Sequence, residues 1–339
     1  VFDRVYDLEI ETHTAAIIIP KKDSKDIELW IQNIGRNFSS SILIPYDDHI
    51  RLCRDLAQWM ENLTEVPTKT YAKEEKDEYF THLFANSNLN EIISEERKKF
   101  IFEAHAYTVS NAYTKSAGVT LARYSDKAFT NEEFDVLKRF AREFEQAYVR
   151  FLDLQKAEAQ AREAQIEAAL ERVRSRSMAM HKSEELREVI QLVFEQFRQL
   201  NFKIDSAQFD PNYKESDDFN LWTAVPGQAY SILQHIPYMD HAVFNSIKEA
   251  KKSELTFMAR SSGFEEKNEF FRHFFQHVRN IPEDRQKFIL DSPGVHRAVV
   301  FMDTIALAIQ NYSAIPYTEE ENVILRRFGK TFEQVYTRF

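Results

Sequence analysis

Two segments of this chain, 188 residues apart, are closely alike. Residues 130–151 read TNEEFDVLKRFAREFEQAYVRF, and residues 318–339 read TEEENVILRRFGKTFEQVYTRF. Chance alone would give about one identity over this length if residue use were roughly even. The identical pairs are Thr130/Thr318, Glu132/Glu320, Glu133/Glu321, Leu137/Leu325, Arg139/Arg327, Phe140/Phe328, Phe144/Phe332, Glu145/Glu333, Gln146/Gln334, Tyr148/Tyr336, Arg150/Arg338 and Phe151/Phe339. A period this long excludes a solenoid and indicates a duplicated domain.

The similarity extends toward the N-terminus of each copy. Residues 76–82 align with residues 267–273, and the segment Ile-Pro-Tyr-x-Asp-His occurs at 44–49 and again at 236–241. Val1, Phe2 and Leu8 align with Val193, Phe194 and Leu200. We therefore expect a first domain at 1–151, with its opening helix truncated, and a second at 183–339. Residues 152–182 are expected to form a connecting helix.

Glycine and cysteine are scarce, and this excludes several functions. The six glycines lie at 35, 118, 227, 263, 294 and 329, so no short stretch contains the several glycines that phosphate-binding and dinucleotide-binding loops require. The single cysteine, Cys53, excludes a disulfide framework and a cysteine-based zinc site, and it is expected to be an inert core residue. The sequence predicts a chain that is not an enzyme.

Charge and hydropathy restrict the partners and the location. The formal net charge is −10, which argues against nucleic acid as a partner of this fragment. No apolar run approaches the roughly 18 residues of a membrane span, so no membrane contact is expected. A reducing, cytoplasmic location fits the single cysteine.

The hydrophobic pattern of the second copy predicts an α+β fold. Apolar residues from Leu186 to Leu200 hold helical spacing, and β-like runs follow at 204–210, 219–225 and 230–238. Residues 240–290 are predicted to be mostly helical, and 296–312 to form two more strands. A final helix is expected from Thr318, where Thr-x-x-Glu is a capping box that Thr130 and Glu133 repeat. The order α-βββ-α-ββ-α indicates an antiparallel sheet flanked by helices.

The connector carries no helix-breaking residue. Neither glycine nor proline occurs between Val119 and Asp210, so one helix is expected from about Asn131 to about His181. Apolar residues recur every seven positions along it, which predicts the seam of a parallel homodimer. An alanine-rich spacer helix in solvent is the alternative. The predicted seam residues are Leu152, Ala159, Ile166, Leu170, Val173 and Met180.

These features resemble a known family. The connector ALERVRSRSMAMHKSEEL and the EE-x-x-x-LxRF helices are similar to tandem GAF-like sensor domains of bacterial signalling proteins. The resemblance implies two GAF-like domains that pass a ligand signal or a conformational signal through a dimeric helix to an effector outside these residues, such as a histidine kinase, phosphatase, cyclase or DNA-binding domain. The chain lacks the NKFDE-type motif of cyclic-nucleotide-binding members and a cysteine placed to attach a bilin, so the cofactor is unknown. The alternative is a ligand-free scaffold for dimerisation and interaction.

The repeated Ile-Pro-Tyr-x-Asp-His segment has two explanations. In one, Asp48 or Asp240 caps the helix that follows, and the proline ends the strand. In the other, the segment forms the rim of a ligand pocket, which the resemblance would place between the sheet and the crossing helices. The candidate ligand-binding residues are Trp30, Tyr46, His49, Trp222, Tyr238 and His241.

His273 and His277 have the spacing of two metal ligands, but no carboxylate completes the set, so we predict a packing role and no metal.

Overall fold

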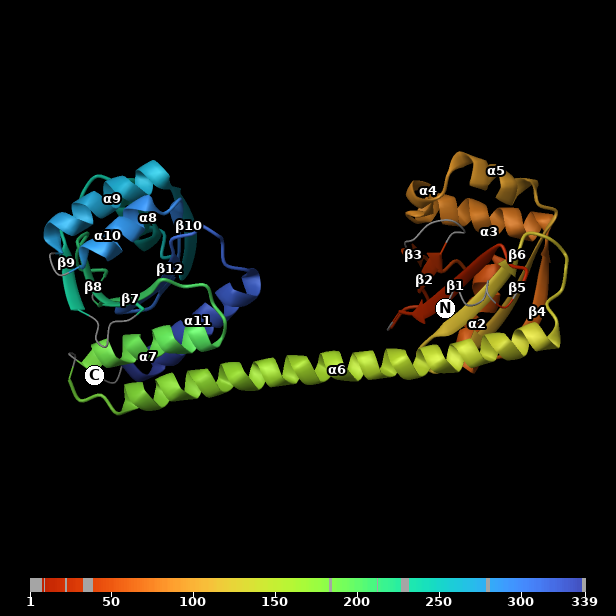
Figure 1. The fold of residues 1–339 in the computed structure, drawn as a ribbon, viewed down its shortest axis with the longest axis horizontal. Helices are drawn as coiled ribbons and strands as arrows, with labels where there is room; N and C mark the ends of the chain where they lie inside the picture. The colour runs from red at the N-terminus through yellow and green to blue at the C-terminus, as the bar shows by residue number, and fades with distance from the viewer. Residues whose placement is uncertain are drawn as a thin grey trace. The chain divides into compact units, whose positions relative to one another are not determined.

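The computed structural model describes residues 8, 10–21, 23–32, 39–182, 185–211, 213–226, 232–278 and 281–336. It divides into two compact units, Val1–Ala157 and Glu158–Phe339, here called unit 1 and unit 2. Figure 1 shows the fold of each unit with its elements labelled. The helix α6, Asn131–Met178, begins in unit 1 and ends in unit 2.

Unit 1 contains a six-stranded antiparallel sheet in the order β3-β2-β1-β6-β5-β4. Its strands are β1 Thr14–Pro20, β2 Ile27–Gln32, β3 Ser39–Ile44, β4 Val66–Ala72, β5 Ala106–Tyr113 and β6 Gly118–Arg123. Its helices are α2 Arg51–Asn62, α3 Lys73–Asn86, α4 Leu89–Ile92, α5 Glu95–Glu103 and the first part of α6.

Unit 2 repeats this sheet in the order β10-β11-β12-β7-β8-β9. Its strands are β7 Ser206–Pro211, β8 Phe219–Ala224, β9 Ile232–Ile236, β10 Phe257–Gly263, β11 Gly294–Phe301 and β12 Ile305–Asn311. Its other helices are α7 Leu186–Gln199, α8 Ala242–Lys252, α9 Phe264–His277, α10 Glu283–Asp291 and α11 Glu319–Tyr336. Read from β4 to β3, the strand order of unit 1 matches that of unit 2 at every position, and Pro45 and Pro237 each follow the third strand. The predicted duplication and α+β class are confirmed.

One strand in each copy was missed by the sequence prediction. The region 240–290, predicted as mostly helical, contains the edge strand β10, and β4 is its counterpart in unit 1. Both are edge strands whose residues are largely exposed or half-buried. They therefore lack the alternation that a half-buried strand shows, and β4 also contains Pro67, which only an edge strand tolerates.

Each sheet buries apolar side chains on both of its faces. In unit 2, α8, α9 and α10 cover one face through Phe244 and Phe270, among others. Helices α7 and α11 and the last part of α6 cover the other face through a second cluster that includes Phe197 and Phe328. In unit 1, α2 to α5 cover the first face and α6 covers the second.

The repeated sequence near the end of each copy has a structural explanation. Both capping boxes form: the backbone N–H of Glu133 donates to Thr130 Oγ1 at 3.2 Å, and Thr318 and Glu321 repeat that bond at 3.2 Å. The glutamate of each Phe-Glu-Gln triplet binds the turn between the last two strands. The hydroxyl of Thr114 donates to Glu145 Oε2 at 2.7 Å, and the N–H of Asp303 donates to Glu333 Oε1 at 2.8 Å.

The long helix forms as predicted, but most of its predicted dimer seam lies inside unit 2. Ile166, Leu170, Val173 and Met180 are all buried in the cluster with α7 and α11. Their heptad spacing is therefore explained by packing within one chain, and a second helix could not reach them there. Leu152 and Ala159 are exposed. The predicted connector 152–182 is thus not a separate element, because its second half belongs to the core of unit 2.

None of the described helices, α6 included, has a stretch apolar enough to cross a bilayer.

The burial of Ile166 predicts a difference between two of the predicted seam residues, Ile166 and Leu152. Ile166→Ala should lower the free energy of unfolding of unit 2 by about 2–5 kcal/mol, because it leaves a cavity in a closed core. Leu152→Ala should change it by no more than about 0.5 kcal/mol. Urea unfolding would be followed by the fluorescence of Trp222, in a background where Trp30 and Trp59 are phenylalanine. Equal effects at the two positions would contradict this burial.

Candidate functional site

The inner face of the unit 2 sheet carries an unusual group of buried polar side chains. Gln208 and Asp210 lie two residues apart on β7 and therefore point to the same face. Arg297 on β11 and Gln310 on β12 face the same side of the sheet, toward α8 and α9. Gln208, Asp210 and Gln310 are each at most 9% exposed. Burying polar groups is costly unless they are paired, so each needs a partner.

Arg297 is held in place by an amide rather than by a carboxylate. Its Nε and Nη2 donate to Gln310 Oε1 at 3.1 and 2.8 Å, and its guanidinium lies 5.5 Å from the centre of the Phe270 ring. Among the residues that the structure describes, no carboxylate forms an ion pair with it. Burial lowers the pKa of Arg297 to about 10, which still leaves it charged at neutral pH. The result is a half-buried positive charge that forms no ion pair with a described carboxylate, although Asp210 lines the same cavity.

Asp210 lies beside Arg297 in the same cavity lining. Its Oδ1 accepts a long hydrogen bond, 3.4 Å, from the backbone N–H of Asn220. Burial raises the pKa of Asp210 to about 7, although that hydrogen bond and the charges of Lys251 and Arg297 favour the ionised form. The carboxyl group can therefore be neutral near physiological pH and donate a hydrogen bond.

Two small cavities lie at this face, with volumes of about 30 and 20 Å³. Both are lined by Arg297 and by Ile247 of α8. Asp210 lines the larger one, and Arg260 and Lys267 line the smaller one. Each has room for about one or two waters. A larger molecule would have to displace the α8 side of the cavity.

Lys267 has a structural role that unit 1 repeats. Its Nζ donates to the carbonyl oxygen of Ile289, in the last turn of α10, and to that of Ser292, just after the helix, the latter at 2.7 Å. Lys76 in unit 1 donates in the same way to Ile101 at 2.5 Å. These buried lysines stabilise helix ends by binding their unpaired carbonyl groups. We therefore assign Lys267 to the scaffold rather than to ligand recognition.

Unit 1 has an apolar core at the positions of this polar group. The ladder that pairs Arg297 with Gln310 pairs Val109 with Ala122 in unit 1. The counterparts of Gln208 and Asp210 are Ala16 and Ile18, by their pairing with the sixth strand. All four unit 1 residues are buried in one hydrophobic cluster. The half-buried charge is thus a property of unit 2 and not of the duplicated fold.

The predicted pocket residues have mainly structural contacts. The backbone N–H groups of Tyr46 and Tyr238 donate to Asp26 and Asp218, both at 2.8 Å. The carbonyl oxygens of the prolines just before them bind the rings of His82 and His273 at 2.9 and 2.8 Å. These paired bonds account for the Ile-Pro-Tyr part of the segment in both copies. The rings of His273 and His277 lie 4.7 Å apart, centre to centre.

The expected aspartate caps do not form. In unit 2 the cap is His241, whose Nδ1 accepts from the N–H of Val243 at 3.1 Å and whose Nε2 lies 3.1 Å from the carbonyl oxygen of Glu266. Asp240 instead accepts from the amide of Asn245. In unit 1, α2 begins after Ile50 without a side-chain cap. Histidine replaces aspartate because its ring can cap α8 and reach α9 together.

The two tryptophans do not join the tyrosines and histidines in a pocket. Trp222 packs against the cluster that contains α7 and α11, which is the opposite face of the sheet from Tyr238. Trp30, on β2, is 37% exposed. The alternation of strand side chains explains this, because Leu221 and Leu29, next to the tryptophans, take the positions that face the other helices.

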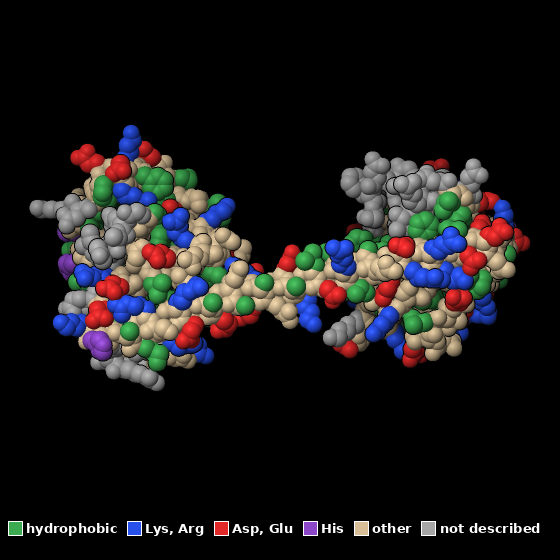
Figure 2. All heavy atoms as spheres, turned by 60° about the horizontal axis from the view of Figure 1, so that its bottom comes forward, with side chains coloured by type: hydrophobic (Ala, Val, Ile, Leu, Met, Phe, Trp, Pro, Cys, Tyr) green, Lys and Arg blue, Asp and Glu red, His purple; other side chains and the backbone are tan. Residues whose placement is uncertain are grey.

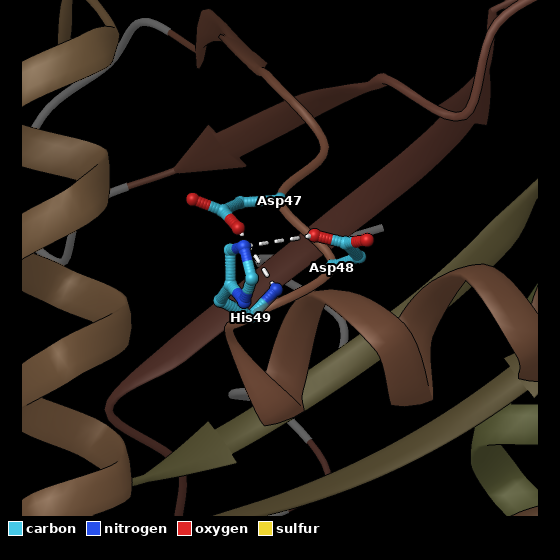
Figure 3. A group of neighbouring side chains, drawn as sticks. All are labelled: Asp47, Asp48 and His49. Carbon is cyan, nitrogen blue, oxygen red and sulfur yellow. Dashed lines mark hydrogen bonds and ion pairs between the residues drawn. The ribbon is translucent and has the colours of Figure 1, made fainter.

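Asp47, Asp48 and His49 bring three possible metal-ligand atoms together on one turn of unit 1 (Figure 3). The His49 N–H donates to Asp47 Oδ1 at 2.9 Å, and its ring lies 3.6 Å from Asp48. The side chains of His49 and Asp48 are largely exposed, 91% and 72%. Three adjacent residues on an exposed turn do not enclose a cation, and the turn's own bonds explain the cluster.

Cys53, on α2 nearby, is buried, and burial raises its pKa to about 11, so its thiol is unreactive.

Sequence analysis missed Gln208, Asp210, Arg297 and Gln310. The signal that could have found them is a comparison of the two copies, since Arg297 aligns with Val109 at the same offset as the C-terminal repeat. A polar residue in only one copy of a duplicated strand is a departure from the shared core pattern.

Comparison with known proteins adds structural likeness only. No protein-family model and no curated protein sequence matches the chain. The GAF domain from an Acinetobacter phosphoenolpyruvate-protein phosphotransferase is similar at 10% identity, covering 50% of this chain and 92% of its own, with a TM-score of 0.33. The bacteriophytochrome RpBphP3 from R. palustris is similar at 8% identity, covering 96% of this chain and 68% of its own, with a TM-score of 0.34. The fold description given above depends on the strand order of each unit and not on these matches.

The raised pKa of Asp210 predicts a pH-dependent stability. Because the folded state binds a proton that the unfolded state has lost, stability should fall as the pH rises from about 4 to about 7. Asp210→Asn has no carboxyl group to ionise. Between pH 5 and pH 8 the free energy of unfolding of this variant should therefore rise relative to that of the parent by an amount on the order of 2 kcal/mol. Urea unfolding of unit 2 at both pH values measures it. A stability difference that stays constant with pH would contradict the raised pKa.

Proposed function

We propose that this chain is a non-catalytic sensory and regulatory region of a bacterial signalling protein, and that unit 2 binds a small anionic ligand. Two α+β domains share one continuous helix, and in the second Asp210, Gln208 and Arg297 line a small cavity between the sheet and α8. The sequence resemblance to tandem GAF-like sensors supports the same assignment. The ligand signal would pass through α6 to an effector outside these residues, in the cytoplasm.

The observation that carries the proposal is the replacement of Val109 and Ala122 by Arg297 and Gln310. Placing a guanidinium in this core without an ion-pair partner should lower the stability of unit 2, because no attraction compensates for the desolvation of the charge. The charge lines cavities that have room for about one or two waters, and a small carboxylate could enter if the α8 side moved outward. A carboxylate would supply the missing counter-ion, and Asp210 in its neutral form could donate a hydrogen bond to it.

The position of Arg297 also suggests how binding could be transmitted within unit 2. Its neighbours on β11, Ala298 and Val300, point to the opposite face and pack in the cluster that contains the last part of α6. A ligand that enters the cavity would bind better when α8 lies farther from β11. Since the other face of β11 packs in the cluster that contains α6, the ligand would favour the α6 packing that fits this position of β11. The coupling would therefore cross a single strand.

Small carboxylates are the natural probes for this cavity. Saturation-transfer NMR with acetate and formate should detect binding to the parent chain, and Arg297→Val combined with Gln310→Ala, which recreates the unit 1 pair, should abolish it. Arg272→Ala, which removes an exposed arginine from α9, is the matched control and should bind like the parent. Circular dichroism verifies folding. No transfer in the parent, or equal transfer in the double variant, would argue for the ligand-free scaffold.

A scaffold function has one observation in its favour, the exposed apolar stripe on α6. Phe144, Tyr148, Phe151 and Leu152 follow helical spacing on one side of the helix, and Phe151 and Leu152 are 51% and 41% exposed. Figure 2 shows hydrophobic side chains, in green, among charged ones along the exposed part of this helix. We propose that a second copy of the chain pairs here, rather than along the buried positions from Ile166 onward.

Charge on this stripe should separate such a homodimer. Phe151→Glu with Leu152→Glu should convert dimer to monomer in light scattering, because pairing would bury the new carboxylates. Ala157→Glu with Ala164→Glu adds the same charge on the other side of the helix and should leave the mass unchanged. A parent that is already monomeric would refute pairing at this stripe.

A further inference from the structure

Unit 1 contains a cavity of about 360 Å³ at the end of its sheet. It is lined by the turn between β5 and β6, by the C-terminal half of α2, and by the residues that follow β1. Tyr113, Thr114, Lys115, Met60, Lys25 and Pro20 are among its lining residues. The cavity is about ten times larger than the polar cavities of unit 2 and lies in a different part of the fold.

The equivalent space in unit 2 is occupied by a tyrosine side chain. The ring of Tyr213 lies 5.4 Å from the ring of Phe301, and its hydroxyl donates to the carbonyl oxygen of Met302 at 2.8 Å. Lys251 of α8 lies 5.9 Å from the same ring. Tyr213 is buried, 4% exposed, so it fills this space as part of the core.

The sheet registers show that the two places correspond. Phe301 pairs with Ala306 at the end of the β11–β12 hairpin, as Tyr113 pairs with Gly118 in unit 1. Met302 and Thr114 then follow, and their N–H groups donate to Ile305 and Ala117 in the same way. Tyr213 lies three residues after Asp210, and Lys21 lies three residues after the counterpart Ile18. Lys21 is exposed, so no side chain from this position fills the unit 1 cavity.

Two aligned positions around these places carry charges of opposite sign. Asp217 and Asp303 are the unit 2 counterparts of Lys25 and Lys115, because Asp218 and Asp26 bind equivalent tyrosines and Met302 aligns with Thr114. Asp217 pairs with Lys248 and Lys251 in unit 2. In unit 1 the two lysines lie at the cavity instead, with Glu61 as the acidic residue of its lining.

We propose that the unit 1 cavity is a binding site for a small aromatic molecule that carries both a phenolic hydroxyl and a carboxylate. The ring would lie against Tyr113, in the space that Tyr213 fills in unit 2. The hydroxyl would donate to the carbonyl oxygen of Thr114, as Tyr213 donates to Met302. The carboxylate would meet Lys25 and Lys115 at the rim, where its charge remains partly in water. The site is independent of the anion cavity of unit 2.

Calorimetric titration of the whole chain with 4-hydroxyphenylacetate tests the site. The parent should bind one molecule in unit 1. Lys21→Tyr supplies the side chain that unit 2 uses, and Ala57→Trp fills the cavity from α2, so either should weaken binding at least tenfold. The double variant Lys25→Glu with Lys115→Glu should raise the dissociation constant of 4-hydroxyphenylacetate at least tenfold. The same variant should change the dissociation constant of the uncharged probe 4-ethylphenol by less than threefold. Arg297→Val should have no effect, which separates this site from the proposed anion site.

Unit 2 provides the matched control. Tyr213→Ala opens the corresponding space with Asp217 and Asp303 at its rim, and it should not create a second site for 4-hydroxyphenylacetate. The proposal is overturned if the parent does not bind at millimolar concentration, if both filling variants bind like the parent, or if Tyr213→Ala adds a second site of equal affinity.

Discussion

The two faces of each six-stranded sheet must both be covered, and this requirement organises the molecule. In unit 2, helices α7, α11 and the last part of α6 cover one face. The ring centres of Phe197 and Phe328 lie 4.4 Å apart, and Val173 of α6 is buried in the same core. The last turns of α6 are thus part of a domain rather than a free connector. Any change in the packing of this face must involve α6, because its buried side chains leave no space for independent movement.

Because the opposite face of unit 2 has ample apolar cover of its own, it can include a charge. Phe244 of α8 and Phe270 and Phe271 of α9 are buried in the core at this face, and Arg297 lies against Phe270. The amide of Gln310 orients the guanidinium without neutralising it. In unit 1 the positions equivalent to Arg297 and Gln310 are apolar, although Asn111 is buried on the same face, and an open space lies where unit 2 uses Tyr213. The two copies have therefore kept one scaffold and placed their cavities at different ends of it.

Much of the fold could be predicted from the sequence, and the sites could not. The repeat, the capping boxes at Thr130 and Thr318 and the unbroken helix depend on residues close together in sequence, so local patterns reveal them. The heptad spacing from Ile166 to Met180 predicts a dimer seam wrongly, because an apolar stripe shows that a helix is buried but does not show which element buries it. The sequence does not show which face of its sheet each tryptophan takes, and Trp222 lies on the opposite face from Tyr238, against expectation.

The sequence by itself determined that two copies of one α+β domain follow each other on a single long helix, because duplicated residues and helix propensity need no distant partner. Tertiary structure decided which side of each strand faces which helices. Only that choice brings Arg297, Gln310 and Asp210 together from three strands. Only the hairpin register that the two units share shows that Tyr213 fills a space that is open beside Tyr113. Such contacts join residues far apart in the chain, and the sheet register that creates them is fixed by packing across the whole domain.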